Sequence, residues 1–157
     1  MKNTKIISGF PGVGKSQLFK NKDFEGLVIM DSDSSKFSWI EKGVRHPEFP
    51  NNYIEHIRSH IGKADIILVS SHEVVRKALV KSGIPFTLVY PAKECKDTYM
   101  KNYKERGNNE AFLTFIDTNW DKFIDEIDDI DCGLISKAKL SEGEYLSTIV
   151  SDIIMNF

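Results

Sequence analysis

Short runs of apolar residues alternate along the chain with longer segments in which apolar residues recur every three or four positions. The runs are rich in valine and isoleucine and lie at residues 5–8, 27–30, 65–70, 86–90 and, more weakly, 133–136. Because most positions in them are apolar on both faces, they predict the strands of a parallel sheet that helices cover. Pro85 and Pro91 bracket the fourth run and predict its ends.

The segments between these runs have the spacing of amphipathic helices. Helices are predicted from Lys15 onward and over residues 51–61, 73–82, 110–127 and about 144–155. The apolar stripe of the longest one consists of Phe112, Phe115, Ile116, Trp120, Phe123, Ile124 and Ile127. We expect this stripe to pack in the core rather than to form an aromatic ligand site.

Strands and helices alternate within a chain of 157 residues, enough for one compact domain with a core. This pattern predicts a single α/β domain over residues 1–157, a three-layer sandwich with a five-stranded parallel sheet.

Composition narrows the classes of function. Hydrophobic residues make up 41% of the chain, charged residues 28%, and the net charge is −2. This balance excludes a uniformly basic surface for nucleic acid, although a local basic groove stays possible. Cys95 and Cys132 lie far apart, which argues against a structural zinc site and a disulfide framework. No membrane span or signal peptide is evident, so we expect a cytoplasmic protein. We expect a monomer or a homodimer, between which the sequence does not decide.

A complete phosphate-binding loop follows the first apolar run. Residues 9–16, Gly-Phe-Pro-Gly-Val-Gly-Lys-Ser, match G-x-x-x-x-G-K-[ST], with a strand before them and a helix start after them. Glycines let backbone N–H groups turn inward around phosphate oxygens, and the helix N-terminus adds positive charge. We expect Lys15 to reach the β- and γ-phosphates and Ser16 to bind Mg²⁺. The predicted ATP-binding residues are Gly9, Pro11, Gly12, Val13, Gly14, Lys15, Ser16 and Gln17.

Two carboxylates, Asp31 and Asp33, follow the second apolar run. Ligands of a parallel sheet bind beyond the carboxyl ends of its strands, the edge at which the phosphate loop also lies. Residues two apart in an extended segment face the same way. Phosphoryl transfer needs a group that positions magnesium and one that orients the acceptor, so the two carboxylates can divide these roles. The alternative is an ordinary turn.

With these motifs, the chain resembles the small P-loop kinases, whose fold is the P-loop NTPase fold. That group includes nucleoside monophosphate kinases, shikimate and gluconate kinases and polynucleotide 5′-kinases, and the chain is also similar to bacteriophage kinases of deoxynucleotide metabolism. The phosphate loop and the Asp-Ser-Asp motif carry the resemblance, over approximately residues 1–35. In shikimate-kinase-like members the first aspartate helps to hold magnesium and the second contacts the acceptor. The resemblance therefore implies a metal-side role for Asp31 and an acceptor-side role for Asp33.

Some expected features are missing. The third run ends in Val-Ser-Ser-His at 69–72, without the carboxylate that often ligates magnesium there, so Asp31 would act on the metal through water. The glycine-rich acceptor motif of shikimate kinase is also missing, which argues against a small-acid substrate. His56 and His60 are one helical turn apart, but no third ligand is evident, so we expect both to face solvent.

Basic residues suited to binding the acceptor lie on three segments. Arg45 follows the Asp-Ser-Asp motif, Arg58 lies on the next predicted helix, and His72 and Arg76 begin the helix after the third run. The run from Ser71 to Arg76 resembles the polar T-N-x-x-x-R run that polynucleotide-kinase-like proteins have at the same place. Cationic groups there would bind the acceptor and stabilise the transferring phosphate.

A lid is predicted at approximately residues 100–112. Lys101, Lys104 and Arg106 precede the turn Gly-Asn-Asn at 107–109. This segment looks like the lid of small kinases, whose basic residues close over the phosphates and exclude water. Arg106 is the favoured lid residue, and with Lys15 and Asp33 it completes the predicted catalytic set.

Together these features predict an ATP-dependent kinase, with Mg²⁺ as its cofactor, that phosphorylates a nucleoside or deoxynucleoside monophosphate. Alternative acceptors are a polynucleotide 5′-hydroxyl, a modified base in DNA and a small hydroxyl metabolite. The negative net charge weighs mildly against a nucleic-acid partner. An alternative of another class is a non-catalytic nucleotide-binding switch, against which the Asp-Ser-Asp motif beside a lid argues.

Overall fold

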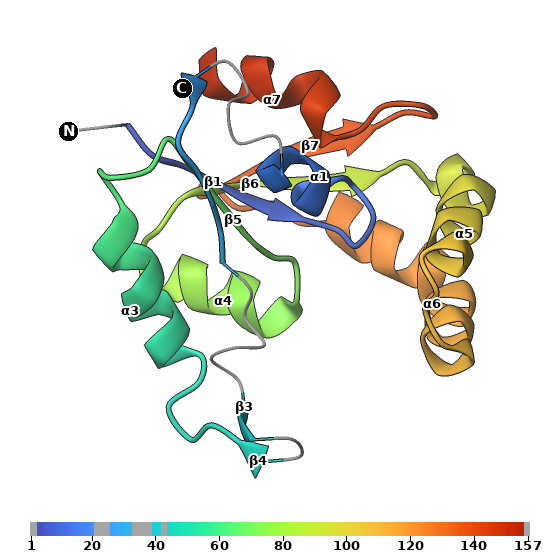
Figure 1. Ribbon diagram of the computed structural model, residues 1–157, viewed down its shortest axis with the longest axis horizontal. Helices are drawn as coiled ribbons and strands as arrows, with labels where there is room; N and C mark the ends of the chain where they lie inside the picture. Colours follow the sequence, from blue (N-terminus) through green and yellow to red (C-terminus); the bar gives the residue numbers. More distant parts are fainter. Residues whose placement is uncertain (1–2, 21–25, 33–38, 42–43, 156–157) are drawn as a thin grey trace.

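A five-stranded, all-parallel sheet forms the centre of the molecule, as seen in a computed structural model that describes residues 3–20, 26–32, 39–41 and 44–155. Its strands lie in the order β2-β5-β1-β6-β7 (Figure 1). Their bounds are Lys5–Gly9 for β1, Ile29–Asp31 for β2, Ile66–Ser70 for β5, Phe86–Pro91 for β6 and Ile135–Leu140 for β7. The predicted parallel α/β sheet is therefore confirmed.

Helices cover both faces of this sheet, which gives the three predicted layers (Figure 1). One face carries α1 (Lys15–Lys20) and α7 (Leu146–Met155), and the other carries α3 (Asn51–His60), α4 (Glu73–Lys81) and α6 (Glu110–Asp128). A short 3₁₀ helix, η2 (Lys93–Cys95), leads into α5 (Lys96–Glu105), which packs antiparallel to the first half of α6 at one end of the molecule. Within the described ranges, no helix has the length and apolarity needed to cross a membrane.

The core is continuous beneath the phosphate loop. Trp120 of α6 is completely buried and lies edge-on to Phe10, with ring centroids 5.6 Å apart. Its indole Nε1 donates a hydrogen bond to the Lys93 carbonyl at 2.9 Å. A buried indole rarely leaves its N–H without an acceptor, so this bond fixes the ring orientation. Trp120 thereby connects the α5–α6 hairpin to the loop after β1.

Two strand predictions were displaced along the chain. The second strand begins at Ile29, two residues later than predicted, and includes Asp31 as its last residue. The fifth was predicted at 133–136 but runs over Ile135–Leu140. This edge strand has several exposed side chains, among them Lys137 and Lys139, so the rule that sheet strands are apolar on both faces missed most of it.

A separate two-stranded antiparallel sheet was not predicted. It joins β3 (Trp39–Glu41) to β4 (Val44–Arg45) and lies beyond α3 and α4, apart from the main sheet (Figure 1). Strands of three and two residues carry too little alternation of apolar and polar positions to be recognised from sequence.

The apolar stripe of α6 divides into two groups, which corrects the prediction that all of it is core. Ile116, Trp120, Ile124 and Ile127 are buried, as predicted. Phe112 and Phe123 are only half-buried, and Phe115 is 56% exposed. The stripe is wider than the surface that the sheet and α5 can cover, so its outer edge stays accessible.

Candidate functional site

The phosphate loop connects β1 to α1 in a conformation that depends on glycine. Gly12 and Gly14 have φ angles of +91° and +107°, which side chains disfavour. Helix α1 begins directly afterwards at Lys15, and Leu18 N–H donates to the Gly14 carbonyl at 2.9 Å. Neighbouring segments hold the loop, because Phe10 N–H donates to the Val89 carbonyl and Leu146 N–H to the Val13 carbonyl. This strand–loop–helix geometry suits the cradling of an anion.

Two tyrosines of α5 pack against the phosphate loop, and neither was identified from the sequence. A Cβ atom on Gly12 would lie 2.9 Å from Cε1 of Tyr103 and 3.1 Å from Cδ2 of Tyr99. Tyr103 also donates a hydrogen bond from Oη to the Pro11 carbonyl at 2.5 Å. Burial raises the pKa of Tyr103 well above its usual range, so the hydroxyl stays protonated as a donor. Tyrosines four residues apart were the available signal, but no helix was predicted over residues 96–105.

Lys15 extends across the carboxyl end of the sheet. Its Nζ lies 3.5 Å from the carbonyl oxygen of Val69, near the end of β5. A Cβ atom on Gly9 would lie 2.9 Å from Cγ and Cδ of Lys15, so the first glycine of the motif leaves room for the lysine stem. Ser16 and Gln17 are exposed in the first turn of α1. The predicted ATP-binding residues thus share one loop and helix start.

The strand order reverses between β1 and β5. The chain leaves β1 through α1 toward β2, and leaves β5 through α4 toward β6, on opposite faces of the sheet (Figure 1). Such a switch point opens a crevice beyond the carboxyl ends of the two strands. Ser8 Oγ donates to the Ser70 carbonyl at 2.9 Å, and His72 N–H donates to Ser70 Oγ at 3.1 Å. The two strand ends and the start of α4 are therefore held together.

Ser32, between the two aspartates, is anchored from α3. It is only 3% exposed, its carbonyl accepts a hydrogen bond from Tyr53 Oη at 2.5 Å, and its Oγ lies 3.0 Å from His56 Nε2. His56 was expected to face solvent but is half-buried, because the serine hydroxyl and His60 lie against it. Burial, and secondarily His60, lower the pKa of His56. The prediction that Asp33 orients the acceptor concerns a residue outside the described ranges.

Asp31 lies at the same edge as the phosphate loop but two strands away from β1. It is the last residue of β2, and its side chain is exposed. Strand β5 lies between β2 and β1, so two strand spacings, about 10 Å, separate their backbones. The role of Asp31 in holding magnesium through water stays a prediction.

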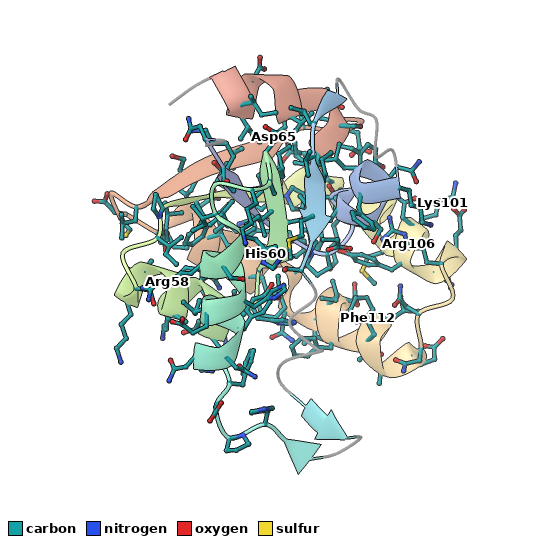
Figure 2. All side chains as sticks on the ribbon, turned by 60° about the vertical axis from the view of Figure 1, so that its left-hand side comes forward. Arg58, His60, Asp65, Lys101, Arg106 and Phe112 are labelled. Atoms are coloured by element: carbon teal, nitrogen blue, oxygen red, sulfur yellow. The ribbon has the colours of Figure 1, made fainter. Side chains whose placement is uncertain are left out.

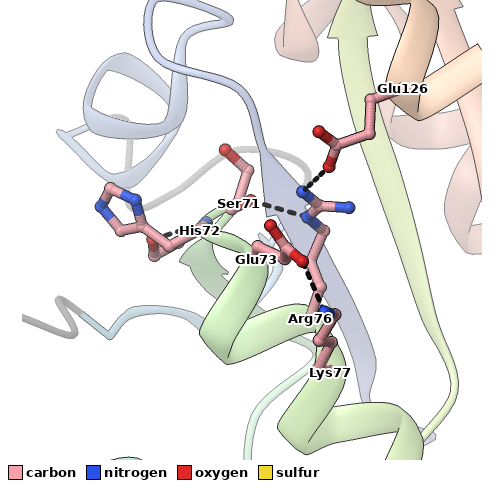
Figure 3. Close-up of polar contacts among 7 residues, drawn as sticks. Ser71, His72, Glu73, Arg76, Lys77 and Glu126 are labelled. Carbon is pink, nitrogen blue, oxygen red and sulfur yellow. Dashed lines mark hydrogen bonds and ion pairs between the residues drawn. The ribbon is translucent and has the colours of Figure 1, made fainter. Parts of the chain in front are cut away.

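Arg76 is held firmly at the start of α4 (Figure 3). Its Nε donates to the Ser71 carbonyl at 2.8 Å, and its Nη2 lies 3.1 Å from Oε1 of Glu126. The side chain is 12% exposed. Among the described residues Nη1 has no hydrogen-bond partner, so that nitrogen can donate to a ligand. Glu126 was not identified from sequence, because it lies in the acidic run at residues 125–131, which is typical of a solvated helix end and turn.

Lys15, His72 and Arg76 line one cavity of about 500 Å³, which we call the α6 pocket. It lies between the phosphate loop, the start of α4 and α6. Its aromatic wall comes from α6, and it also includes Glu73 and Glu126. The remaining lining residues are Gly9, Phe10, Pro11, Ser70, Ser71, Phe112, Phe115, Ile116, Phe123 and Ile127. The structure therefore brings together three residues that the sequence assigned to the two substrates.

A second cavity of about 410 Å³, the α5 pocket, lies beside the other end of the loop. Gly14 and Gln17 of the predicted ATP site line it together with exposed Arg106. Asn102 Nδ2 donates to Tyr145 Oη across this pocket at 3.1 Å. Its remaining lining residues are Glu105 and Ser147. The predicted lid residue Arg106 thus neighbours the loop.

No described contact places Arg45 or Arg58, the two other predicted acceptor-binding arginines, at the α6 pocket. Arg58 Nη2 donates to the carbonyl of Ser82, the C-cap of α4, at 3.1 Å. His72 is the N-cap at the other end of this nine-residue helix, which is about 13 Å long, and Arg76 is its fourth residue. Figure 2 accordingly shows Arg58 far from Phe112. The backbone of Arg45 lies in β4, and its side chain is not described.

The described donors suit a magnesium ion that is bound mainly through phosphate. No three of the described histidine, cysteine, aspartate and glutamate side chains are arranged to hold a metal ion. Magnesium in phosphoryl-transfer sites keeps several waters and binds one or two protein groups beside the substrate phosphates. Ser16 and, through water, Asp31 stay the residues predicted for this role. No protein-family model matches the chain, and no curated protein matches its sequence significantly.

Proposed function

We propose that this protein is an ATP-dependent phosphotransferase whose acceptor is a nucleoside or deoxynucleoside monophosphate. The observation that carries the proposal is the lining of the α6 pocket, which Lys15 of the phosphate loop shares with His72 and Arg76. A phosphate bound by the loop would have the guanidinium group of Arg76 on the opposite wall. Such groups stabilise the charge that develops on a transferring phosphoryl group.

In the proposed reaction an acceptor oxygen forms a bond to the γ-phosphorus of ATP. The bond from that phosphorus to the β–γ bridging oxygen breaks, and ADP leaves with the electron pair. Lys15 and Arg106 neutralise the transferring group, and Arg76 binds the acceptor phosphate through Nη1. A hydroxyl acceptor would give its proton to Asp33. Magnesium, when bound at Ser16, supplies further neutralisation of the phosphates.

A nucleic-acid acceptor, either a 5′-hydroxyl or a hydroxyl on a modified base, is the second candidate. Two observations favour it over a small metabolite. The α6 pocket has an aromatic wall that includes the exposed Phe115, and Arg58 lies at the far end of α4. The pocket therefore offers more surface to a base, and less charge to an acceptor phosphate, than the sequence predicted. Binding to DNA should then weaken steeply as salt is raised.

The test is transfer of the γ-phosphate of ATP to a panel of nucleosides, nucleotides and single-stranded oligonucleotides. We expect Lys15→Ala and Asp33→Asn to lower the transfer rate by two or more orders of magnitude, about the effect of removing one group that stabilises the transition state. Lys20→Ala, an exposed substitution in the last turn of α1, is the matched control and should retain full activity.

Two results would contradict the proposal. Equal transfer rates in the wild type, Lys15→Ala and Asp33→Asn would show that Lys15 and Asp33 do not form the catalytic site. Tight ATP binding without transfer to any acceptor would instead identify a nucleotide-binding switch.

A further inference from the structure

The outer edge of the α6 stripe is an aromatic surface that the fold leaves uncovered. Phe115 and Phe123 pack on each other with centroids 5.5 Å apart and planes inclined by 57°. Phe112 lies edge-on to Tyr103 at 5.3 Å, so it is continuous with the support of the phosphate loop. An aromatic ring that is 56% exposed, as Phe115 is, leaves favourable burial unused in the free protein.

This aromatic surface faces the same cavity as the phosphate-binding groups. Phe112, Phe115 and Phe123 form one wall of the α6 pocket, and Lys15 and Arg76 belong to the same pocket. The pocket therefore combines an apolar, planar-sided region with cationic nitrogens. A ligand that complements both regions carries a flat ring at one end and a phosphate or hydroxyl near the other.

The volume of the pocket is consistent with such a ligand. About 500 Å³ lies within the usual range for small-molecule sites. Aromatic side chains bind nucleobases by stacking on their π faces, and this contact tolerates different bases. A nucleobase inserted along α6 would cover Phe115 while its sugar or phosphate reached toward Lys15 and Arg76.

From this arrangement we propose that the α6 pocket binds the nucleobase of the acceptor, with Phe115 as its principal stacking surface. The inference rests on the proposed function and deepens it, because it names a base-bearing acceptor for the same site. The base can come from a free nucleotide or from a single-stranded oligonucleotide, since both present the same ring. Phe115 is therefore a specificity residue rather than part of the core.

The test compares ligands with and without a base by calorimetric titration. The free-nucleotide arm uses the four common deoxynucleoside monophosphates against 2-deoxyribose 5-phosphate. The oligonucleotide arm uses a mixed-sequence single strand against the same strand made abasic at its 5′ end. We expect the base to tighten binding roughly tenfold in at least one arm, and the arm that responds identifies the source of the base.

Variants of α6 then locate the contact. Phe115→Ala should weaken binding of the base-bearing ligand roughly fivefold or more, while Phe115→Tyr should keep it within about twofold. Leu113→Ala is the matched control, because Leu113 lines a groove beside α5 on the other side of the helix. ATP affinity should be unchanged in all three variants, and thermal unfolding should show that each is folded.

Equal affinity for base-bearing and base-free ligands in both arms, or equal loss in Phe115→Ala and Leu113→Ala, would overturn the inference. Either result can occur in a protein that still transfers phosphate, in which case the proposed function stands. Base binding that depends on Phe115 in a protein without phosphotransfer would support the inference and remove the proposed function. The two failures are therefore distinguishable.

Discussion

The two cavities beside the phosphate loop are built differently. Apart from Gly14, the α5 pocket is lined by polar residues, including Gln17, Asn102 and Arg106, with Tyr145 held by a hydrogen bond. The α6 pocket is mainly apolar, and its arginine is fixed by an ion pair with Glu126. The phosphate loop therefore lies between a cavity without phenylalanines, with an exposed arginine, and a phenylalanine-lined cavity, with an arginine held by an ion pair. This difference suggests that the two sides bind different parts of a two-substrate complex.

The largest effect on ATP binding and on stability should come from a substitution that disrupts the phosphate loop, which borders both cavities. Gly12→Ala places a Cβ atom 2.9 Å from Tyr103 at a φ angle of +91°. We expect ATP binding to be lost and unfolding to become easier by at least about 2 kcal/mol, because backbone strain and the clash add. Calorimetric ATP titration and denaturant unfolding measure the two effects.

Gly107→Ala is the control for that substitution. Gly107 also has a positive φ angle, +85°, but a Cβ atom there would meet open space. Only the backbone strain should remain, about 1 kcal/mol, with ATP binding intact. Equal ATP affinity in the two variants would show that the contact with Tyr103 does not matter for the loop.

Two arginine substitutions should show whether the two cavities bind different substrates. Arg76→Ala should raise the acceptor KM roughly tenfold and leave the ATP KM unchanged, because a hydrogen bond to a charged ligand is lost. Arg106→Ala should leave the acceptor KM unchanged, raise the ATP KM and lower kcat, because Arg106 is proposed to neutralise the transferring phosphate. Lys77→Ala, an exposed neighbour of Arg76, is the control for steady-state kinetics. The same KM pattern in both arginine variants would contradict a division between the pockets.

A pair of tyrosine substitutions tests the support beneath the loop. Tyr103→Phe removes the hydrogen bond to the Pro11 carbonyl and should lower the free energy of unfolding by about 1 kcal/mol. Tyr99 Oη is buried without a hydrogen-bond partner among the described residues. Tyr99→Phe should therefore be neutral or slightly stabilising. Denaturant unfolding of the two variants gives the comparison, and a larger loss in Tyr99→Phe would contradict it.

The smallest expected effect is a pH dependence of stability from His56, which lies beside Ser32. The pKa of His56 is lowered from 6.5 in the folded protein, so the unfolded chain binds the proton more readily. The contribution of His56 to stability should be complete above pH 6.5 and should decline as the pH falls below that value. Unfolding at pH 7.5 and 5.5 measures the decline. His56→Gln should reduce it, and an unchanged pH dependence in this variant would assign the effect to other groups.

The sequence predicted the elements better than it predicted their surfaces. β1 and β5 were placed closely because continuous apolar runs are what a covered parallel sheet requires. The edge strand β7 was misplaced because its exposed side chains break that pattern. On α6, periodicity identified the stripe, but it could not separate buried Trp120 from exposed Phe115. That separation depends on how much of the helix its neighbours cover.

The candidate site shows the same division. Lys15 and Ser16 were predictable because the phosphate loop is a local motif in which backbone geometry and residue order coincide. Arg58 and Arg76 looked alike in sequence, since both lie on helices after strands. Their distance from the loop follows from the orientation of α3 and α4, which no local pattern encodes.

By itself, the sequence determined the strand–helix alternation and the phosphate loop, because hydrophobic periodicity and glycine conformation act over a few neighbouring residues. Only the tertiary structure decided that Tyr103 supports the loop, that Glu126 restrains Arg76, and that Phe115 faces a cavity shared with Lys15. Those contacts join residues about 50 to 100 positions apart. They exist because the strand order brings distant strand ends and helices to one edge of the sheet.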